Sequence, residues 1–266
     1  MSATLAFGIT AAERADHARL GTAIERLGFA ELWVNDTRQG DGLATLAAIE
    51  AGTRSLRFGV GVISLSEQSP AQILERLASA KLPTDRLTLG IGSGSSASLQ
   101  LIRDAVAELR RREPDRTIAV AAVGPRMAHL AGEIADAVVA NWALPARLAW
   151  IRERVAEGAH AAGRPPPRLI AYVRTAVGAG AADRLETEMN RYRGYGDHYA
   201  RAFDAQPGGL IGVAVESGSR ADITAALTPF QSVVDTVVVR ALAANDSVDE
   251  WLQVASAAAP ATSHHG

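Results

Sequence analysis

The corner Gly124-Pro125-Arg126 separates an apolar run from a segment with a helical pattern. Glycine allows a ligand to approach the main chain closely, and the start of a helix offers unpaired N–H groups. The arginine adds a fixed positive charge, so these three residues could bind an anion such as a phosphate group. They would serve equally well as an ordinary turn with a solvated arginine, and the residues alone leave both interpretations open.

Small and polar residues also stand where the other apolar runs end. They are Thr10, Asn35-Asp36-Thr37, Gly61-Val62-Ile63-Ser64, Ser93-Gly94-Ser95-Ser96, Asn141, Arg174 and Arg240. This set is rich in glycine and serine, and Asp36 is its one carboxylate. It suits a flat, phosphorylated cofactor that brings its own chemistry better than it suits acid–base catalysis by side chains.

Residue types that are missing exclude several classes of site. The chain has no cysteine, which removes disulfides, zinc–thiolate sites and thiol nucleophiles. The single lysine, Lys81, precedes a predicted strand, which argues against a Schiff-base enzyme of the barrel type. His17, His129 and His160 fall within predicted helices, so we expect no metal site.

The composition is that of a globular protein that acts on a small molecule. The chain has 266 residues, of which 48% are hydrophobic, and a formal net charge of −2. This is enough for a sizeable core and gives no basic surface for nucleic acid. The apolar runs fall short of the ~20 residues that span a bilayer, and the N-terminus lacks a signal-peptide pattern. We therefore expect a cytoplasmic protein with neither a membrane nor a nucleic-acid partner.

Short apolar runs alternate with longer amphipathic segments along the whole chain. The predicted strands are Leu5–Ile9, Glu31–Asn35, Arg57–Ile63, Leu87–Ile91, Ile118–Val123, Ala137–Asn141, Leu169–Ala176 and Asp235–Arg240. Most of these runs are continuously apolar, which indicates strands buried on both faces of a parallel sheet. The predicted helices cover residues 11–27, 41–53, 70–80, 97–112, 126–134, 145–162, 183–200, 219–230 and 247–258.

Eight strands that are each followed by a helix predict a (β/α)8 barrel. We expect a single domain over residues 1–260 and a disordered tail over residues 261–266. An open, doubly wound sheet is the alternative fold. The turn Gly90–Ser95 argues against it, because this turn lacks the third glycine position of a dinucleotide-binding turn.

Several segments resemble, in order, the luciferase-like family of flavin- and deazaflavin-dependent oxidoreductases. ERLGFAELWVND (Glu25–Asp36), Leu46–Ile73 and LTLGIGSG (Leu87–Gly94) resemble its early helices and strands. AAVGPRMAHLAGEIADAVVANW (Ala121–Trp142) and AYVRTAVG (Ala171–Gly178) are similar to the branch that uses the deazaflavin coenzyme F420. That branch includes methylenetetrahydromethanopterin reductase. The resemblance implies a (β/α)8 TIM barrel that is usually a homodimer.

The resemblance also implies where the cofactor would bind. In the family, the cofactor phosphate lies over the loops that follow the fourth and fifth strands. The residues in those places are Ser93, Gly94, Ser95, Val123, Gly124, Pro125 and Arg126. The segment Gly61-Val62-Ile63 matches a bulge that supports the tricyclic ring, often with a cis peptide bond. We predict strain at that bulge.

Four further residues are candidates that the resemblance suggests. Asp36 matches an acidic residue near the ring and is the candidate catalytic residue, although Thr37 replaces the histidine that often follows it. Asn141 could contact the cofactor, or it could merely cap a strand. Arg174 and Arg240 could face an acidic cofactor tail, or they could be partners in structural ion pairs.

The chain departs from the family between the fourth and fifth strands, where a long insertion is usual. Here little more than one predicted helix separates Ile91 from Ile118. We expect a site that is open, or covered by Tyr192–Tyr199 or by a partner subunit. The resemblance implies hydride transfer between F420 and an unknown organic substrate. The alternatives are an FMN-dependent monooxygenase and a non-catalytic flavin-binding protein.

Overall fold

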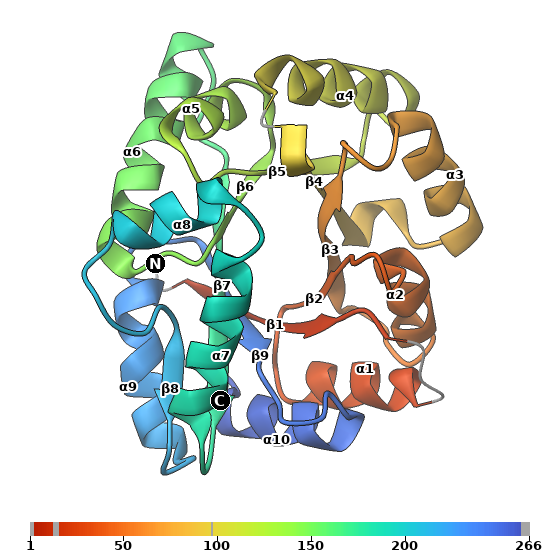
Figure 1. The fold of residues 1–266 in the computed structure, drawn as a ribbon. Helices are drawn as coiled ribbons and strands as arrows, with labels where there is room; N and C mark the ends of the chain where they lie inside the picture. Colours follow the sequence, from red (N-terminus) through yellow and green to blue (C-terminus); the bar gives the residue numbers. More distant parts are fainter. Residues whose placement is uncertain (1–2, 13–15, 97, 262–266) are drawn as a thin grey trace, which may run out of the picture.

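Parallel strands form a closed ring in the computed structural model of the chain, which describes residues 3–12, 16–96 and 98–261 (Figure 1). The strands are β1 (Thr4–Thr10), β2 (Glu31–Asn35), β3 (Arg57–Ser64), β4 (Leu87–Gly92), β5 (Thr117–Ala121), β6 (Ala137–Asn141), β7 (Arg168–Val177), β8 (Val213–Val215) and β9 (Thr236–Ala241). The ring runs from β1 through β7 to β9, and β9 pairs with β1. The predicted (β/α)8 barrel is therefore confirmed, and the open-sheet alternative is wrong.

Helices cover the outside of the ring on all sides (Figure 1). They are α1 (His17–Arg26), α2 (Gly42–Glu50), α3 (Pro70–Ala80), α4 (Leu99–Arg112), α5 (Pro125–Ile134), α6 (Pro145–Ala161), α7 (Ala181–Arg193), α8 (Asp197–Asp204), α9 (Arg220–Gln231) and α10 (Val248–Ala258), with short 3-10 turns η1 (Thr84–Arg86) and η2 (Gly94–Ser96). Side chains cap several of them. Asp41 accepts from two N–H groups at the start of α2, and Ser69 with Gln72 forms a capping box on α3.

The structure differs from the sequence prediction after β7. The predicted helix 183–200 is two helices, α7 and α8, because Gly196 has a φ of 139° that no helix can accommodate. Strand β8 was not predicted. It has three residues and pairs only with the upper end of β7, from Thr175 to Val177. Residues 262–266 of the predicted tail lie outside the described residues.

The connection between β4 and β5 is short, as predicted. In the described part of this connection, η2 and α4 are the regular elements between Gly92 and Thr117. The family's long insertion has no counterpart here. In the described ranges, no helix is long and apolar enough to cross a membrane.

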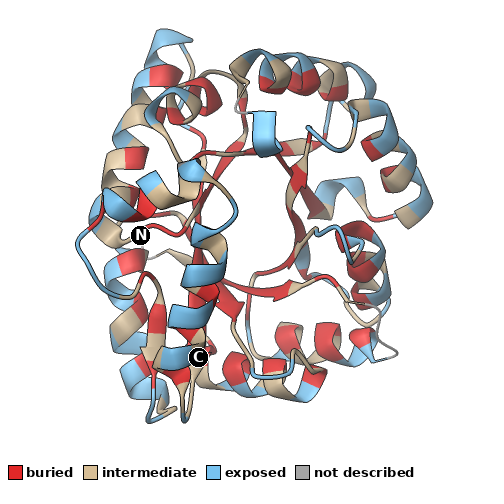
Figure 2. Cartoon of the chain, viewed as in Figure 1, coloured by how far each residue is buried: buried red, intermediate tan, exposed pale blue. Residues whose placement is uncertain are grey.

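Figure 2 shows that the strands of the ring and one face of many helices are buried. The buried residues of the barrel form one layer between the ring and its helices and another inside the ring. The inner layer contains Trp33 and Tyr172, whose ring centroids lie 5.8 Å apart in an edge-to-face arrangement. Small residues such as Ala6 and Ala119 fill the space around them. The interior is thus packed at mid-height rather than open as a pore.

A buried ion-pair cluster fills the N-terminal end of the barrel. The carboxylate of Glu31 is 1% exposed and accepts hydrogen bonds from Trp33 Nε1 (2.8 Å), Arg57 Nη2 (2.9 Å) and Arg168 Nη1 (2.5 Å). These residues lie at or near the starts of β2, β3 and β7. Because this cluster and the inner layer fill the lower barrel, a ligand must enter from the opposite end.

Candidate functional site

Buried polar atoms without hydrogen-bond partners gather at the C-terminal end of the barrel. Among the described residues, these atoms include Asn35 Oδ1, Trp142 Nε1, Tyr172 Oη, Arg174 Nε and Arg240 Nε. Buried polar groups are nearly always paired in folded proteins, so such a cluster needs an explanation. Since the atoms come from β2, β7, β9 and the residue after β6, they surround one mouth. The mouth has the donors and acceptors that a polar ligand would use.

Tyr172 carries the polar group deepest in this mouth. Its position on β7 is two residues before Arg174, so both side chains rise on the inner face of the strand. Burial raises the pKa of the Tyr172 hydroxyl well above its usual value, and the group remains a neutral donor. Tyr172 was not among the predicted site residues, although its spacing of two residues from the candidate Arg174 places both side chains on one face of the strand.

The bulge predicted at Gly61-Val62-Ile63 exists, although without the cis peptide bond that the family often has there. The register of β3 against β4 shifts between Val60 and Ile63, and in the described chain all peptide bonds are trans. A Cβ on Gly61 would lie 2.9 Å from Asn35 Cα and 3.3 Å from Tyr172 Oη. Glycine is therefore required at this point for the close approach of the neighbouring strand.

The two residues after Gly61 face different layers. Val62 is half-buried and packs against the inner layer, where its Cγ1 lies 2.4 Å from the position of a Cβ on Gly92. Ile63 is fully buried in the outer core beneath the helices. Gly61 and Val62 thus line the mouth, as predicted, while the side chain of Ile63 does not.

The loop after β4 is fastened to the loop after β3. Gly94 has a φ of 60°, and a Cβ there would lie about 2 Å from the hydroxyls of Ser64 and Ser66. The main-chain N–H of Ser95, which was predicted to contact an anion, donates to Ser66 Oγ at 3.3 Å. The segment Ser93–Ser95 therefore stands in a defined position at the predicted phosphate site, with the N–H of Ser95 already engaged.

The Gly124-Pro125-Arg126 corner has open space beside Gly124. Gly124 is the N-cap of α5, no side chain caps that helix, and a Cβ on Gly124 would have no atom within 4 Å. Pro125 occupies the first helical turn, while Val123 contributes a carbonyl that accepts from Arg147 Nη2 (2.9 Å). The first turn of α5 thus has main-chain N–H groups without a side-chain cap, and their contact with an anion stays a prediction.

The guanidinium of Arg126 lies elsewhere. Arg126 is exposed and lines an outer groove with Arg103, His129 and Glu133, among other residues of α4, α5 and α6. Its side chain follows the outer surface of the helix layer. The structure therefore does not bring the charge of Arg126 to the corner that its main chain helps to form.

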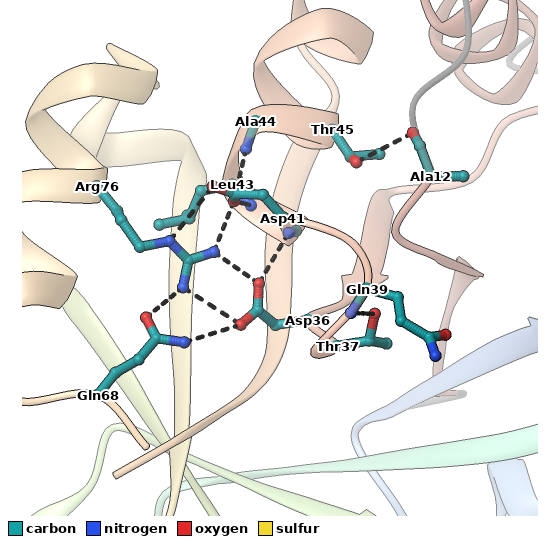
Figure 3. Close-up of polar contacts among 11 residues, drawn as sticks. Ala12, Asp36, Thr37, Gln39, Asp41, Leu43, Ala44, Thr45, Gln68 and Arg76 are labelled. Atoms are coloured by element: carbon teal, nitrogen blue, oxygen red, sulfur yellow. Dashed lines mark hydrogen bonds and ion pairs between the residues drawn. The ribbon is translucent and has the colours of Figure 1, made fainter.

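Asp36 is held by a network between the loop after β2 and helix α3 (Figure 3). Its carboxylate accepts from Arg76 Nη2 (2.7 Å), Arg76 Nη1 (3.2 Å) and the N–H of Gly42 (2.8 Å), and from Gln68 Nε2 at 3.5 Å. The side chain of Asp36 is only 6% exposed. Burial lowers the pKa of Arg76, but its hydrogen bonds to Asp36 and Asp41 outweigh that effect and raise it. These contacts fix the start of α2.

Asn141 links two elements at the edge of the mouth. Its Oδ1 accepts a short hydrogen bond from Arg174 Nη1, and its side chain also bonds to the hydroxyl of Tyr199. Burial, the first cause, and neighbouring Tyr192 raise the pKa of Tyr199 to about 12. Asn141 therefore lies at the edge of the mouth, where it contacts Arg174 and Tyr199 of α8, and its contact with a cofactor stays a prediction.

An aromatic cluster from α7 and α8 covers one side of the mouth. Tyr192 and Phe203 pack on Trp142 with ring centroids 5.1 and 5.5 Å away, and Tyr199 packs on both. The segment Tyr192–Tyr199 was one of the covers that the sequence suggested. In Figure 1, α7 and α8 lie on the side of the ring that β6 and β7 form.

A comparison of the sequence with models of protein families shows the family of this chain. The model for luciferase-like monooxygenases matches residues 3–101 and 99–259. The chain belongs to the luciferase-like monooxygenase family. A curated relative, 5,10-methylenetetrahydromethanopterin reductase of Methanolobus tindarius, is 25% identical over 178 residues, which is 53% of this chain and 55% of that protein. The chain is thus matched to about half the length of that relative.

Solved structures of this luciferase-like fold cover nearly the whole chain. An F420-dependent secondary alcohol dehydrogenase with an F420–acetone adduct has a TM-score of 0.75 at 13% identity, covering 96% of this chain and 98% of its own. The coenzyme F420-dependent tetrahydromethanopterin reductase of Methanopyrus kandleri has a TM-score of 0.71 at 15% identity, with the same coverage. The oxygenating constituent of 3,6-diketocamphane monooxygenase from Pseudomonas putida, in complex with FMN, has a TM-score of 0.68 at 15% identity and covers 97% and 98%. At these identities the likeness establishes the fold.

Proposed function

We propose that the chain is an oxidoreductase that transfers a hydride between deazaflavin coenzyme F420 and an organic substrate. The observation that carries this proposal is the mouth itself. Unpartnered buried polar atoms and an uncapped helix start surround one end of a luciferase-like barrel. These features fit a ring with polar edges and an attached phosphate group better than they fit a site for side-chain catalysis.

The residues of the mouth divide into a ring support and a phosphate contact. Gly61 and Val62 offer a small apolar platform beside the hydroxyl of Tyr172. On the next strands, Ser93, Gly94 and the main chain at Gly124 would hold the phosphate. When bound, the deazaflavin ring supplies the carbon that gives or accepts the hydride. The protein contributes position and exclusion of water.

The cover formed by α7 and α8 supports the same function. The rings of Trp142, Tyr192 and Tyr199 pack against one another and close one side of the mouth. A hydride is lost to side reactions when water enters a site. We infer that this cover takes the place of the family's insertion after β4.

Asp36 is the candidate residue for proton transfer, and that role stays a prediction. Its carboxylate faces Arg76 and the first turn of α2, which supports a role in positioning the loop after β2. A homodimer also stays a prediction. A groove between α2 and α3, lined in part by Ala44, Ala47 and Ala80, is a surface that such a dimer could cover.

FMN is the rival cofactor, because the FMN-bound monooxygenase constituent shares this fold with a TM-score of 0.68. Separate titrations of the purified protein with F420 and with FMN distinguish the two. We expect F420 to bind and its absorbance to bleach when a reducing substrate is added. Submicromolar binding of FMN alone, with oxygen uptake fuelled by NADH, would reject F420. A cofactor that binds tightly but never changes redox state would indicate the non-catalytic alternative.

A further inference from the structure

Two buried arginines stand side by side in the mouth without an acidic partner. Arg174 on β7 and Arg240 on β9 are register partners, and they are 2% and 6% exposed. Among the described residues, neither guanidinium forms an ion pair with a carboxylate. Buried arginines are usually paired with an acid, because removing a charge from water is costly. The pair therefore differs from the other buried charges of this chain, such as Glu31 and Arg116.

The groups that contact the two guanidinium ions are neutral. Arg174 donates to Asn141 Oδ1 and lies over the rings of Trp142 (4.4 Å) and Tyr192 (4.8 Å). Arg240 donates to Thr10 Oγ1 and to the carbonyl of Ala241. In both side chains the Nε–H group lacks a hydrogen-bond partner. Each arginine thus has one N–H donor without a partner and a positive charge that no carboxylate of the described residues pairs with, and a bound anion could interact with both.

Electrostatics within the mouth supports this assignment. Burial is the first cause that lowers the pKa of Arg240, and the positive charge of Arg174 is the second. The carboxylates of Glu188 and Asp246 act on Arg240 only from a distance, and they are engaged with Arg191 and Trp251. The mouth therefore carries an uncompensated positive charge, which an anion would neutralise.

We propose that Arg174 and Arg240 form a subsite for one oxyanion, a carboxylate or a phosphate, of a ligand bound in the mouth. A guanidinium presents parallel N–H donors that match such a group. In the ring, β9 lies four strands from β4, so this subsite is across the barrel from the phosphate position near Ser93–Ser95. The two anion positions are separate.

This geometry has a consequence for the substrate. If the proposed function holds, the anion belongs either to an acidic substrate or to the acidic tail of the cofactor. The rings of Trp142 and Tyr192 lie over the guanidinium of Arg174 and form the wall of the subsite on that side.

The test measures anion-dependent stabilisation by thermal unfolding at constant ionic strength. The probes are inorganic phosphate, malonate, and malonamide as an uncharged analogue of malonate. We expect phosphate or malonate, but not malonamide, to raise the melting temperature of the wild-type chain. Arg174→Met and Arg240→Met should bind the anion about 10- to 100-fold more weakly, the loss typical of a charge-assisted hydrogen bond. Arg116→Met is the matched control, because Arg116 is 5% exposed but pairs with Glu113 outside the mouth, and it should keep the wild-type response.

An equal response of the wild-type chain to malonate and malonamide would overturn the proposal, and this comparison needs no variant. Undiminished anion binding in Arg240→Met would overturn it as well. In cofactor-loaded protein, malonate that binds beside F420 assigns the subsite to a substrate, whereas competition with F420 assigns it to the cofactor tail. Anion binding without any cofactor binding would refute the proposed function alone. Cofactor binding without anion discrimination would refute the subsite alone.

Discussion

Replacement of Asp36 by asparagine separates its structural role from a catalytic one. Asparagine keeps an oxygen for the N–H of Gly42 but loses the negative charge that faces Arg76. Breaking a buried ion pair costs about 3–5 kcal/mol. The side chain of Arg76 is 21% exposed and keeps Asp41 at 2.6 Å, so we expect a smaller loss of about 2 kcal/mol. For a chain of this size, the melting temperature should fall by about 4 °C.

The measurement is thermal unfolding at neutral pH of wild type, Asp36→Asn, Arg76→Gln and the double variant. If the pair acts as a unit, the two single changes have similar costs and the double variant loses much less than their sum. Asp41→Asn is the control, since Asp41 faces the same guanidinium but is 46% exposed, and it should cost under ~1 kcal/mol.

The opposite result would refute this reasoning. If Asp36 handles a proton, Asp36→Asn should unfold like the wild type yet lose turnover and change the pH profile. Arg76→Gln would then keep its turnover. A stable Asp36→Asn variant with lost activity would assign the residue to catalysis and remove the positioning role inferred from its contacts.

Three further predictions concern the base, the edge and the phosphate corner of the barrel. Glu31→Gln breaks the buried ion pairs with Arg57 and Arg168 and should lower the free energy of unfolding by about 3–5 kcal/mol. Cofactor binding by the folded variant should be unchanged. A denaturation midpoint equal to that of the wild type would contradict this prediction. Tyr199, with its pKa raised to about 12, favours folding below pH 10, its unfolded value, and this stabilisation is lost as the pH rises through about 12. A tyrosinate absorbance titration should show that step in the wild type and not in Tyr199→Phe, and a difference between the two titrations that falls near pH 10 would count against it. Gly124→Asp should cap α5 without loss of stability but place a negative charge at the phosphate position. Its affinity for cofactor should therefore fall at least ~10-fold, while Gly124→Ala binds normally. Equal cofactor affinities of Gly124→Asp and Gly124→Ala would exclude this corner as the phosphate site.

The barrel could be predicted from sequence because its strands are buried on both faces. Runs such as Glu31–Asn35 and Ala137–Asn141 have continuously apolar interiors, and the structure gives them the same bounds. Strand β8 could not be predicted, because its three residues have no periodicity and pair only with the end of β7. The break between α7 and α8 had a signal in Gly194 and Gly196, but the polar periodicity around it favoured one helix.

The site was predicted less completely, because its contacts join residues that are far apart in sequence. Nothing near Asp36 indicates that Arg76, on another helix, faces its carboxylate. The residues Arg174 and Arg240 were named as candidates for a cofactor tail or for ion pairs. Their isolation from acids becomes visible only when β7 and β9 lie side by side. Main-chain features such as the Gly124 corner are local, so the sequence indicated them directly.

Difference density from crystals of the protein soaked with F420 tests the central claim most directly. The account predicts the deazaflavin ring against Gly61 and Val62, with its phosphate within hydrogen-bond distance of the main chain at Ser93–Gly94 or Gly124. Density for the bound cofactor outside the mouth, for example in the groove between α2 and α3, would contradict the account.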